Sequence, residues 1–216
     1  MKRPSAVPYH HGNLRAALVD AGLKLIEEKG VRALTLREIG TRVGVSRMAA
    51  YRHFSDKAEL LSAIREAGFL QFVEALEEAW RAARPDFSAR FNALALAYVR
   101  FAAAHRAHFE VMFGQPSSEN LPAGSGPGER AFGILVETIR AGQESGDVRE
   151  GDPVTFARMA WAQVHGISML GLEPDLSPSG AGTKFVEFSS EVLQAGLATS
   201  APKHHEKPSP AGLQLI

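Results

Sequence analysis

The stretch that decides the fold is LTLREIGTRVGVSRMAAYRHFSDK, residues 34–57. Thr35 stands three residues before Glu38, the spacing of a capping box at the start of a helix. Gly44-Val45 makes a tight connection, and Ser46 is a favoured capping residue for the next short helix. A short helix, a turn with glycine and a second short helix indicate a helix-turn-helix, whose second helix enters the DNA major groove.

The rest of the chain also has a helical pattern. Its apolar residues recur at spacings of three and four, and we find no convincing alternation of the kind that marks a strand. We therefore predict an all-α protein: an N-terminal three-helix domain, a long helix and a C-terminal helical domain. The expected helices span about residues 13–29, 35–43, 46–54, 56–84, 87–104, 105–113, 129–145, 153–172 and 184–198.

The predicted helices divide the chain into four parts. Residues 1–12 are expected to form a flexible basic arm, residues 13–57 the helix-turn-helix domain and residues 58–198 the helical body. The tail, residues 199–216, contains three prolines and is expected to be disordered. The loop GQPSSENLPAGSGPG, residues 114–128, is rich in Gly, Pro and Ser and is expected to be mobile.

Charge is distributed unevenly between the two ends of the chain. The 216 residues have a formal net charge of zero, yet residues 1–66 hold 12 Lys and Arg against 7 Asp and Glu. The remaining residues hold 12 against 17, so a basic end is joined to an acidic body. One basic end suits a protein that meets a polyanion at that end only.

Composition limits the remaining classes of protein. The absence of cysteine excludes disulfides, thiolate metal sites and thiol catalysis. There is no run of eighteen apolar residues and no secretory signal pattern at the N-terminus, so we expect a cytoplasmic protein without a membrane partner.

The stretch from residue 34 onward resembles the N-terminal domain of the tetracycline-repressor (TetR) family of bacterial regulators. The family pattern runs Thr, then Ile-Ala, then Gly-Val-Ser, then Tyr-x-His-Phe-x-x-Lys-x-x-Leu, and the likeness covers about residues 12–68. The resemblance implies a homodimeric regulator, usually a repressor, that binds a palindromic double-stranded DNA operator. It also implies that the C-terminal domain binds a small-molecule effector and forms the dimer, with no enzymatic activity and no cofactor.

The resemblance also implies which residues contact DNA. The start of the second helix should meet phosphates, and the start of the third should face base edges, with Arg47 donating to guanine O6 and N7. Tyr51, His53 and Lys57 are expected beside the DNA backbone. Met48 and Ala49 bring no hydrogen-bonding side chain, so specificity is expected to depend on Arg47 and DNA shape. The candidate DNA-binding residues are Thr35, Leu36, Arg37, Ser46, Arg47, Met48, Ala49, Tyr51, His53 and Lys57.

Simpler structural roles stay open for several of these residues. Tyr51 can serve to pack the domain, Arg47 can be a solvated residue near a cap, and Phe54 is expected in the core. His53 invites a metal or general-base role, but a role beside the DNA backbone or within the domain is favoured over it.

The helix PVTFARMAWAQVHGISMLGL, residues 153–172, is apolar on nearly every face. Such a helix is expected to be buried on two sides, against its own core and against a second subunit. Gly166, Ser168 and Gly171 would permit the close approach of another helix. The segment AWAQVHGISML resembles a Trp-x-x-Val-His-Gly signature of one C-terminal subclass of the family, and HGNLRAAL near the start fits that subclass.

We expect an apolar pocket for a hydrophobic or aromatic effector in the body. Trp161 and His165 share one helical face, and Met169 follows a turn later, although plain core packing explains such spacing too. His165 and Arg106 are its expected polar contacts. The candidate pocket residues are Phe72, Arg106, Phe109, Met112, Phe132, Leu135, Ile139, Trp161, His165 and Met169.

Four other functions have weaker support in the sequence. His105 and His108, with His165 as a third ligand, could bind a metal, but no acidic or thiolate partner stands at a suitable spacing. GSGPGER resembles a phosphate-binding loop only superficially, because no strand precedes it. A third alternative is a helical enzyme with His165 as general base, but no nucleophile or paired carboxylate accompanies this histidine. A fourth is an adaptor whose basic head binds acidic proteins, and absence of binding to duplex DNA would favour it.

Overall fold

The computed structural model describes residues 14–114, 126–171, 175–177 and 179–199. The predictions of a flexible arm at 1–12 and of a disordered tail at 199–216 concern residues outside these ranges, apart from Thr199, whose hydroxyl donates to the carbonyl of Gly146. Most of the predicted 114–128 loop also lies outside them. In the described residues the chain is helical, with one isolated bridge between Val148 and Ala198, so the predicted all-α fold class is confirmed. No helix among these residues is both long enough and apolar enough to cross a membrane.

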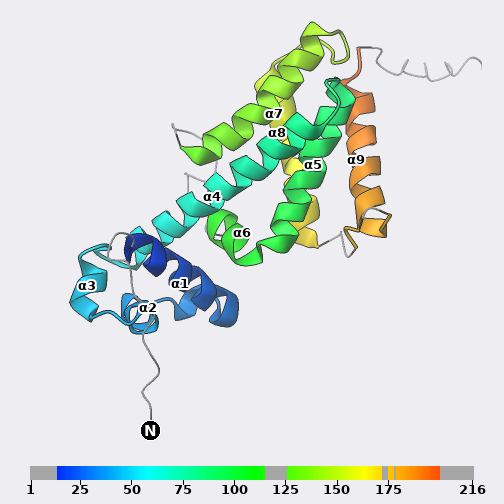
Figure 1. The fold of residues 1–216 in the computed structure, drawn as a ribbon. Coiled ribbons are helices and arrows are strands. Elements are labelled where there is room, and N and C mark those ends of the chain that lie inside the picture. Colours follow the sequence, from blue (N-terminus) through cyan, green and yellow to red (C-terminus); the bar gives the residue numbers. More distant parts are fainter. Residues whose placement is uncertain (1–13, 115–125, 172–174, 178, 200–216) are drawn as a thin grey trace, which may run out of the picture.

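The first helices form a compact head (Figure 1). They are α1 (Leu14–Lys29), a 3₁₀ turn (Val31–Ala33), α2 (Leu36–Val43) and α3 (Arg47–Tyr51). The Thr35 hydroxyl accepts a bond from the Glu38 amide at 3.2 Å, as a capping box requires. The Glu38 carboxylate lies 3.5 Å from Nε of Arg42, so the reciprocal half of the predicted box is replaced by an ion pair along the helix.

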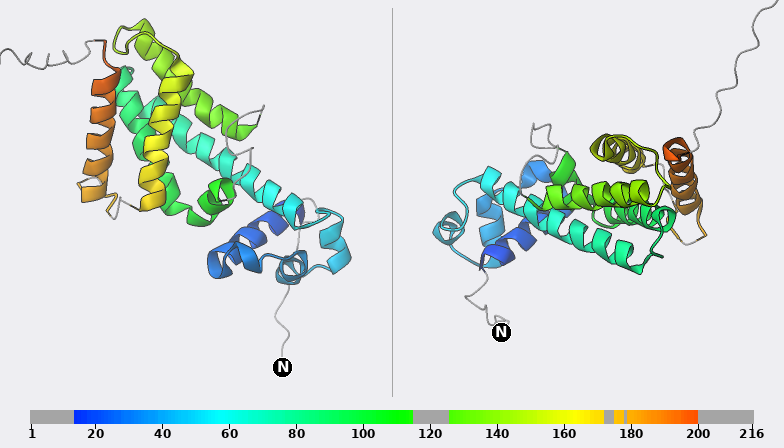
Figure 2. Two further views of the ribbon diagram at one scale, coloured as in Figure 1. Left: turned by 180° about the vertical axis from the view of Figure 1, so that it is seen from behind. Right: turned by 90° about the horizontal axis from the view of Figure 1, so that it is seen from above.

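A long helix, α4 (Lys57–Ala82), leaves the head and crosses the body (Figure 1). Asp56 caps it by accepting a bond from the Glu59 amide at 2.9 Å. The body adds α5 (Phe87–Ala104), α6 (Arg106–Phe113), α7 (Pro127–Glu144), α8 (Pro153–Leu170) and α9 (Ala181–Leu197). In the left view of Figure 2, α8 (yellow) runs across the front of the body with α9 (orange) beside it.

Five helix boundaries differ from the predicted boundaries by two residues or more, and one of them is the end of α8, which lies at Leu170 and not at residue 172. The third helix ends at Tyr51 and not at Phe54, since the chain turns at residues 52–53 and Phe54 then enters the head core. The helix expected from residue 129 begins at Pro127, because proline fits the first turn of a helix. The last helix begins at Ala181, three residues early, and α4 ends at Ala82, two residues before the expected end.

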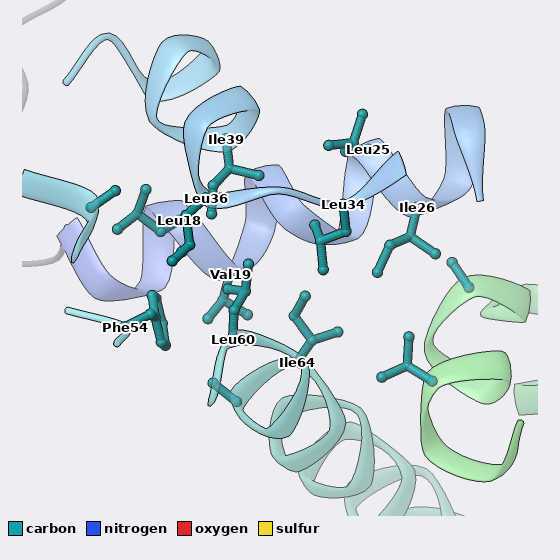
Figure 3. Close-up of a cluster of buried hydrophobic side chains, with 14 residues drawn as sticks. Leu18, Val19, Leu25, Ile26, Leu34, Leu36, Ile39, Phe54, Leu60 and Ile64 are labelled. Atoms are coloured by element: carbon teal, nitrogen blue, oxygen red, sulfur yellow. The ribbon is translucent and has the colours of Figure 1, made fainter. Parts of the chain in front are cut away.

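The head has its own apolar core, drawn in Figure 3. Leu18 of α1, Ile39 of α2 and Phe54 after α3 are fully buried there. Leu60 and Ile64 of α4 belong to the same core, and Ala107 and Val111 of α6 pack against it. The first turns of α4, and one face of α6, are therefore part of the packing of the head.

Candidate functional site

The turn between α2 and α3 sets the direction of α3. Gly44 has φ of 78°, a left-handed conformation that favours glycine, and its amide donates to the carbonyl groups of Gly40 and Thr41. The Ser46 hydroxyl then caps α3 by accepting a bond from the Ala49 amide at 3.2 Å. Because Ala50 is fully buried, one face of α3 is fixed against the head core and the opposite face is exposed.

The exposed face of α3 carries a stacked pair of side chains. The guanidinium carbon of Arg47 lies 5.2 Å from the centre of the Tyr51 ring, and Tyr51 is 40% exposed. This cation–π contact restrains a guanidinium that would otherwise be free in solvent. Met48 is 73% exposed beside the pair. The groups available on this face for contact with DNA are therefore the guanidinium of Arg47, the phenol of Tyr51 and the thioether of Met48.

Two candidate DNA-binding residues have side chains inside the head. Leu36 and Ala49 are only 4% and 8% exposed, and Leu36 belongs to the core of the head. The prediction that Ala49 faces base edges is therefore corrected, and Leu36 can offer DNA only its backbone amide. Thr35, Arg37 and Ser46 are exposed, whereas His53 is half-buried.

Lys57 has a structural contact that the sequence did not suggest. Its Nζ donates to the carbonyl of Val31 at 2.8 Å and lies 3.5 Å from that of Arg32, so it ties the start of α4 to the 3₁₀ turn. An ammonium has three donors, and the half-buried side chain can still present one of them to a phosphate.

Lys57→Met tests both roles of this lysine. Methionine keeps the unbranched aliphatic part of the lysine side chain and removes its charge. The free energy of unfolding should fall by about 1 kcal/mol, because the hydrogen bond to the carbonyl of Val31 is lost. If Lys57 also contacts a phosphate, the slope of log affinity for duplex DNA against log salt should become shallower by about 0.9. Thermal unfolding and a salt titration measure the two effects separately, and an unchanged slope would show that Lys57 acts within the head alone.

The body contains a cavity of about 530 Å³ between α4, α5, α7, α8 and α9. Rings of Phe69, Phe72, Tyr98, Phe132 and Trp161 line it, together with the last residue of α6, Phe113. Such a size and such an apolar lining are typical of small-molecule sites. Its other lining residues are Ser62, Arg65, Glu66, Leu76, Phe91, Leu94, Ala95, Gly126, Pro127, Gly128, Glu129, Ala131, Leu135, Ala160, Gln163, Val164, Ile167, Val186, Ser189, Ser190 and Leu193.

Four of the predicted pocket residues line this cavity: Phe72, Phe132, Leu135 and Trp161. The other six do not, and the prediction is corrected for them. Phe109, Met112 and Ile139 are buried in the core around the cavity, whereas Arg106 and Met169 are exposed. His165 does not line the cavity, but it contacts lining residues, and its Nδ1 lies 2.8 Å from the hydroxyl oxygen of Tyr98.

Tyr98 is the centre of a polar chain in this aromatic region. Trp161 Nε1 donates to the Tyr98 hydroxyl oxygen at 3.2 Å, and the same oxygen lies 2.8 Å from Nδ1 of His165. Burial raises the pKa of the Tyr98 hydroxyl, so the group stays protonated. Burial likewise lowers the pKa of His165, whose ring packs 5.0 Å from that of Phe113 and 5.6 Å from that of Phe109.

Sequence reasoning missed most of the polar residues in the cavity wall. Gln163 of α8 donates to the carbonyl of Ser189 on α9 at 2.8 Å, and Ser190 lines the cavity next to it. Tyr98 had a usable signal, since it is the one polar-tipped aromatic in the apolar helix FSARFNALALAYVRFAAA and a buried phenol needs a partner. The contributions of Gln163 and Ser189 depend on how α8 meets α9, which no local pattern gives.

The histidines proposed as metal ligands are placed differently from one another. His105 is exposed and its ring lies 4.6 Å from that of Phe101, whereas His108 is 4% exposed. Burial lowers the pKa of His108, and the nearby His105 adds to this effect. Across residues 14–114, 126–171, 175–177 and 179–199 no three His, Cys, Asp or Glu side chains gather as a metal site would require. Pro127 of the GSGPGER segment begins α7.

The outer faces of α8 and α9 carry most of the exposed large apolar side chains of the described residues. Phe185, Phe188 and Val192 lie at spacings of three and four along α9, so they form one stripe. Met159, Met169 and Leu170 are at least 50% exposed on α8. Gly166 is open on this helix, since a Cβ there would meet nothing within 4 Å, but Ser168 is buried and its hydroxyl donates to the carbonyl of Val164. The prediction that Ser168 faces a second helix is therefore corrected.

Solved structures show the same fold. A protein of unknown function from Rhodococcus sp. RHA1 is 35% identical, with a TM-score of 0.76 over 89% of this chain and 100% of that one. The fatty acid degradation regulator FadR from Bacillus halodurans is 18% identical, with a TM-score of 0.68 over 88% of this chain and 98% of that one. At that identity the likeness to FadR concerns the fold alone.

Curated relatives are transcriptional regulators. The HTH-type transcriptional regulator Rv1816 of Mycobacterium tuberculosis is 26% identical over 149 residues, 65% of this chain and 62% of its own length. The chain therefore spans less than two thirds of that relative. The tetracycline repressor protein class A from transposon 1721 of Escherichia coli is 33% identical over 110 residues, 49% of this chain and 50% of the repressor.

Two family models match the two parts of the chain. The model of bacterial regulatory proteins of the tetR family matches residues 18–64, which include α2, the turn and α3. The model of the tetracyclin repressor-like C-terminal domain matches residues 91–202, more than half of the chain. With the helix-turn-helix of the head and the helical body on which these matches fall, the chain belongs to the TetR family of bacterial regulators.

Proposed function

We propose that the protein is a ligand-responsive transcriptional repressor that binds a palindromic DNA operator as a homodimer and releases it when a hydrophobic or aromatic small molecule occupies the cavity. The observation that carries the proposal is the placement of α4. Leu60 and Ile64 near its start are packed in the head core, and Phe69 and Phe72 further along line the cavity. One rigid helix therefore contacts both the DNA-binding head and the space where a ligand would lie.

The head supplies the DNA contacts. Arg47 and Tyr51 project from α3, and the N-terminus of α2 presents free amides beside Arg37, which suits a phosphate. In a two-fold dimer the two α3 helices would enter successive major grooves, about 34–36 Å apart. Arg47 is the proposed base reader, because a guanidinium can donate two bonds to guanine.

A second copy of the chain is the proposed occupant of the apolar faces of α8 and α9. Six of the nine exposed large apolar side chains in the described residues lie on these two helices. Gly166, where a Cβ would meet nothing within 4 Å, allows a helix of the partner to approach closely. Two copies related by a two-fold axis would bury these stripes against each other and fix the distance between the heads.

The cavity supplies the response. A ligand that changes the position of Phe69 or Phe72 would move α4 and so the head, and thereby the spacing of the two α3 helices. If the ligand favours the non-binding spacing by about 3 kcal/mol, operator affinity falls by about two orders of magnitude. Adding the ligand to the dimer bound to its operator should therefore release the DNA, and both events can be measured on one sample.

Arg47→Ala tests the proposed base reader. The operator is first selected from a pool of random duplexes, and affinities are then measured by fluorescence anisotropy for every single-base variant. The substitution should cost about 1–3 kcal/mol on the selected operator and remove discrimination at one base pair in each half-site. Arg100→Ala is the matched control, since Arg100 is an exposed arginine of α5 in the body. A loss that is equal for all sequences would show that Arg47 meets phosphate only.

A further inference from the structure

The hydroxyl of Tyr98, a residue that lines the cavity, is held on two sides. Trp161 donates to its oxygen at 3.2 Å, and Nδ1 of His165 lies 2.8 Å away. Tyr98 and Trp161 both line the cavity, whereas His165 is not a lining residue and packs against the rings of Phe109 and Phe113. These contacts fix the position of the oxygen and limit what else it can bind.

Among the described residues, Nδ1 of His165 is the hydrogen-bond acceptor found beside the hydrogen of this hydroxyl. A neutral imidazole carries one N–H, so Nδ1 of His165 either accepts from Tyr98 or donates to it. If Nδ1 accepted, the Tyr98 hydrogen would be paired. If Nδ1 donated, the oxygen would accept twice and its own hydrogen, in a side chain only 5% exposed, would lack this partner. An unpaired buried donor is costly, so the first arrangement is favoured. Tyr98 then has no hydrogen to give and one lone pair left.

The charged residues of the lining gather at one end of the cavity. Arg65 and Glu66 lie on the first half of α4, and Glu129 lies in the first turn of α7. The other lining side chains carry no formal charge. The guanidinium of Arg65 lies 5.7 Å from the ring of Phe69 at that end, whereas Tyr98 contacts the uncharged rings of Phe72, Phe109 and Trp161 and the imidazole of His165. An ionised ligand group at the Tyr98 oxygen would therefore lose its hydration without an opposite charge beside it.

We propose that the effector is a neutral aromatic molecule that carries a hydroxyl or N–H group and donates that hydrogen to the oxygen of Tyr98. His165 and Trp161 are positioning residues: they orient the phenol and leave one lone pair for the ligand. The proposal rests on the proposed function in taking this cavity as the effector site, and it adds the chemical class of the ligand and the residue that recognises it.

Three naphthalenes test the proposal by calorimetry on the full-length protein. They are 1-naphthol, which has a donor, 1-methoxynaphthalene, which lacks it, and naphthalene-1-carboxylate, which is ionised. The naphthol should bind about two to ten times more tightly than the methyl ether, the effect of one hydrogen bond. The carboxylate should bind more weakly than both, because it would be desolvated without a partner charge.

Variants separate recognition from packing. In Tyr98→Phe the naphthol should fall to the affinity of the methyl ether, while the methyl ether keeps its wild-type affinity and so reports an intact cavity. In His165→Leu the preference for naphthol should shrink, because Tyr98 is no longer oriented. His165→Asn should restore part of it, since an amide oxygen can accept near the position of Nδ1.

Several outcomes would overturn the proposal: equal binding of naphthol and methyl ether to the wild type, a preference that survives in Tyr98→Phe, tightest binding of the carboxylate, or no binding of any probe at about 1 mM, a concentration at which even weak aromatic ligands are detected. Operator binding is measured separately on the same samples. A protein that binds its operator but none of the naphthalenes overturns the ligand class and leaves the DNA-binding function standing. Naphthol binding with the expected selectivity and no operator release would instead contradict the proposed response.

Discussion

Phe188→Glu is expected to split the dimer and to lower operator affinity by about two orders of magnitude or more, since two linked heads bind with an avidity about 10²–10⁴ above that of one. Phe188 is 62% exposed at the centre of the stripe formed with Phe185 and Val192. In a two-fold interface the substitution would place two carboxylates in an apolar contact, where each would lose most of its hydration.

The measurement combines light scattering, which gives the molar mass, with anisotropy on the selected operator. Leu70→Glu is the matched control, because Leu70 is 49% exposed on α4 and lies outside both the cavity lining and the α8 and α9 faces. It should leave mass and affinity unchanged. A dimer that persists in Phe188→Glu, or a monomer that binds the operator as tightly as the wild type, would contradict the proposed interface.

The head could be predicted closely because its fold is determined by local rules. Thr35, Ser46 and Asp56 each cap the helix that follows, as their hydroxyl and carboxylate groups suggest. Gly44 takes a left-handed conformation where the turn requires it. The direction of each side chain around α3 does not follow from the sequence, because a helix of five residues has too few positions to define an apolar stripe. Ala49 was expected on the exposed face and is buried.

The cavity could be predicted only in part because it depends on contacts between distant helices. Trp161 was chosen for its spacing to His165 and Phe132 as an apolar residue of another helix, and their rings lie 6.1 Å apart in the structure. The same reasoning selected Met112 and Ile139, since an apolar residue in a core and one in a cavity wall look alike in sequence. Which of them borders the open space is decided by the packing of α4, α5, α7, α8 and α9 together.

The polar contacts of the cavity show the same limit in another form. His165 was expected to meet the ligand itself, because an imidazole in an apolar helix is conspicuous. In the structure it binds Tyr98, a residue 67 positions earlier in the chain, and the phenol takes its place at the wall. A buried polar residue can be recognised from sequence, but its partner is fixed by the tertiary fold.

Phe54→Ala is expected to lower the free energy of unfolding of the head by about 3–5 kcal/mol, the usual cost of removing a buried phenylalanine. Phe54 is fully buried directly after α3, in the core formed with Leu18 and Leu60 (Figure 3). The guanidinium of Arg15 also lies 5.1 Å from its ring and would lose that contact. A loss of this size is comparable with the total stability of a small domain, so α3 should lose its fixed position at 25 °C.

The expected readout is the loss of operator binding while the cavity still binds 1-naphthol, since Phe54 packs in the head core and the cavity is lined by residues of the body. Thermal unfolding should show a lower and broader transition. Phe54→Leu is the graded control, because it keeps most of the apolar volume and should cost roughly 1.5 kcal/mol or less. If Phe54→Ala bound the operator as tightly as Phe54→Leu, the orientation of α3 would not depend on this side chain, and α3 would have to be held by Ala50 and the Ser46 cap alone.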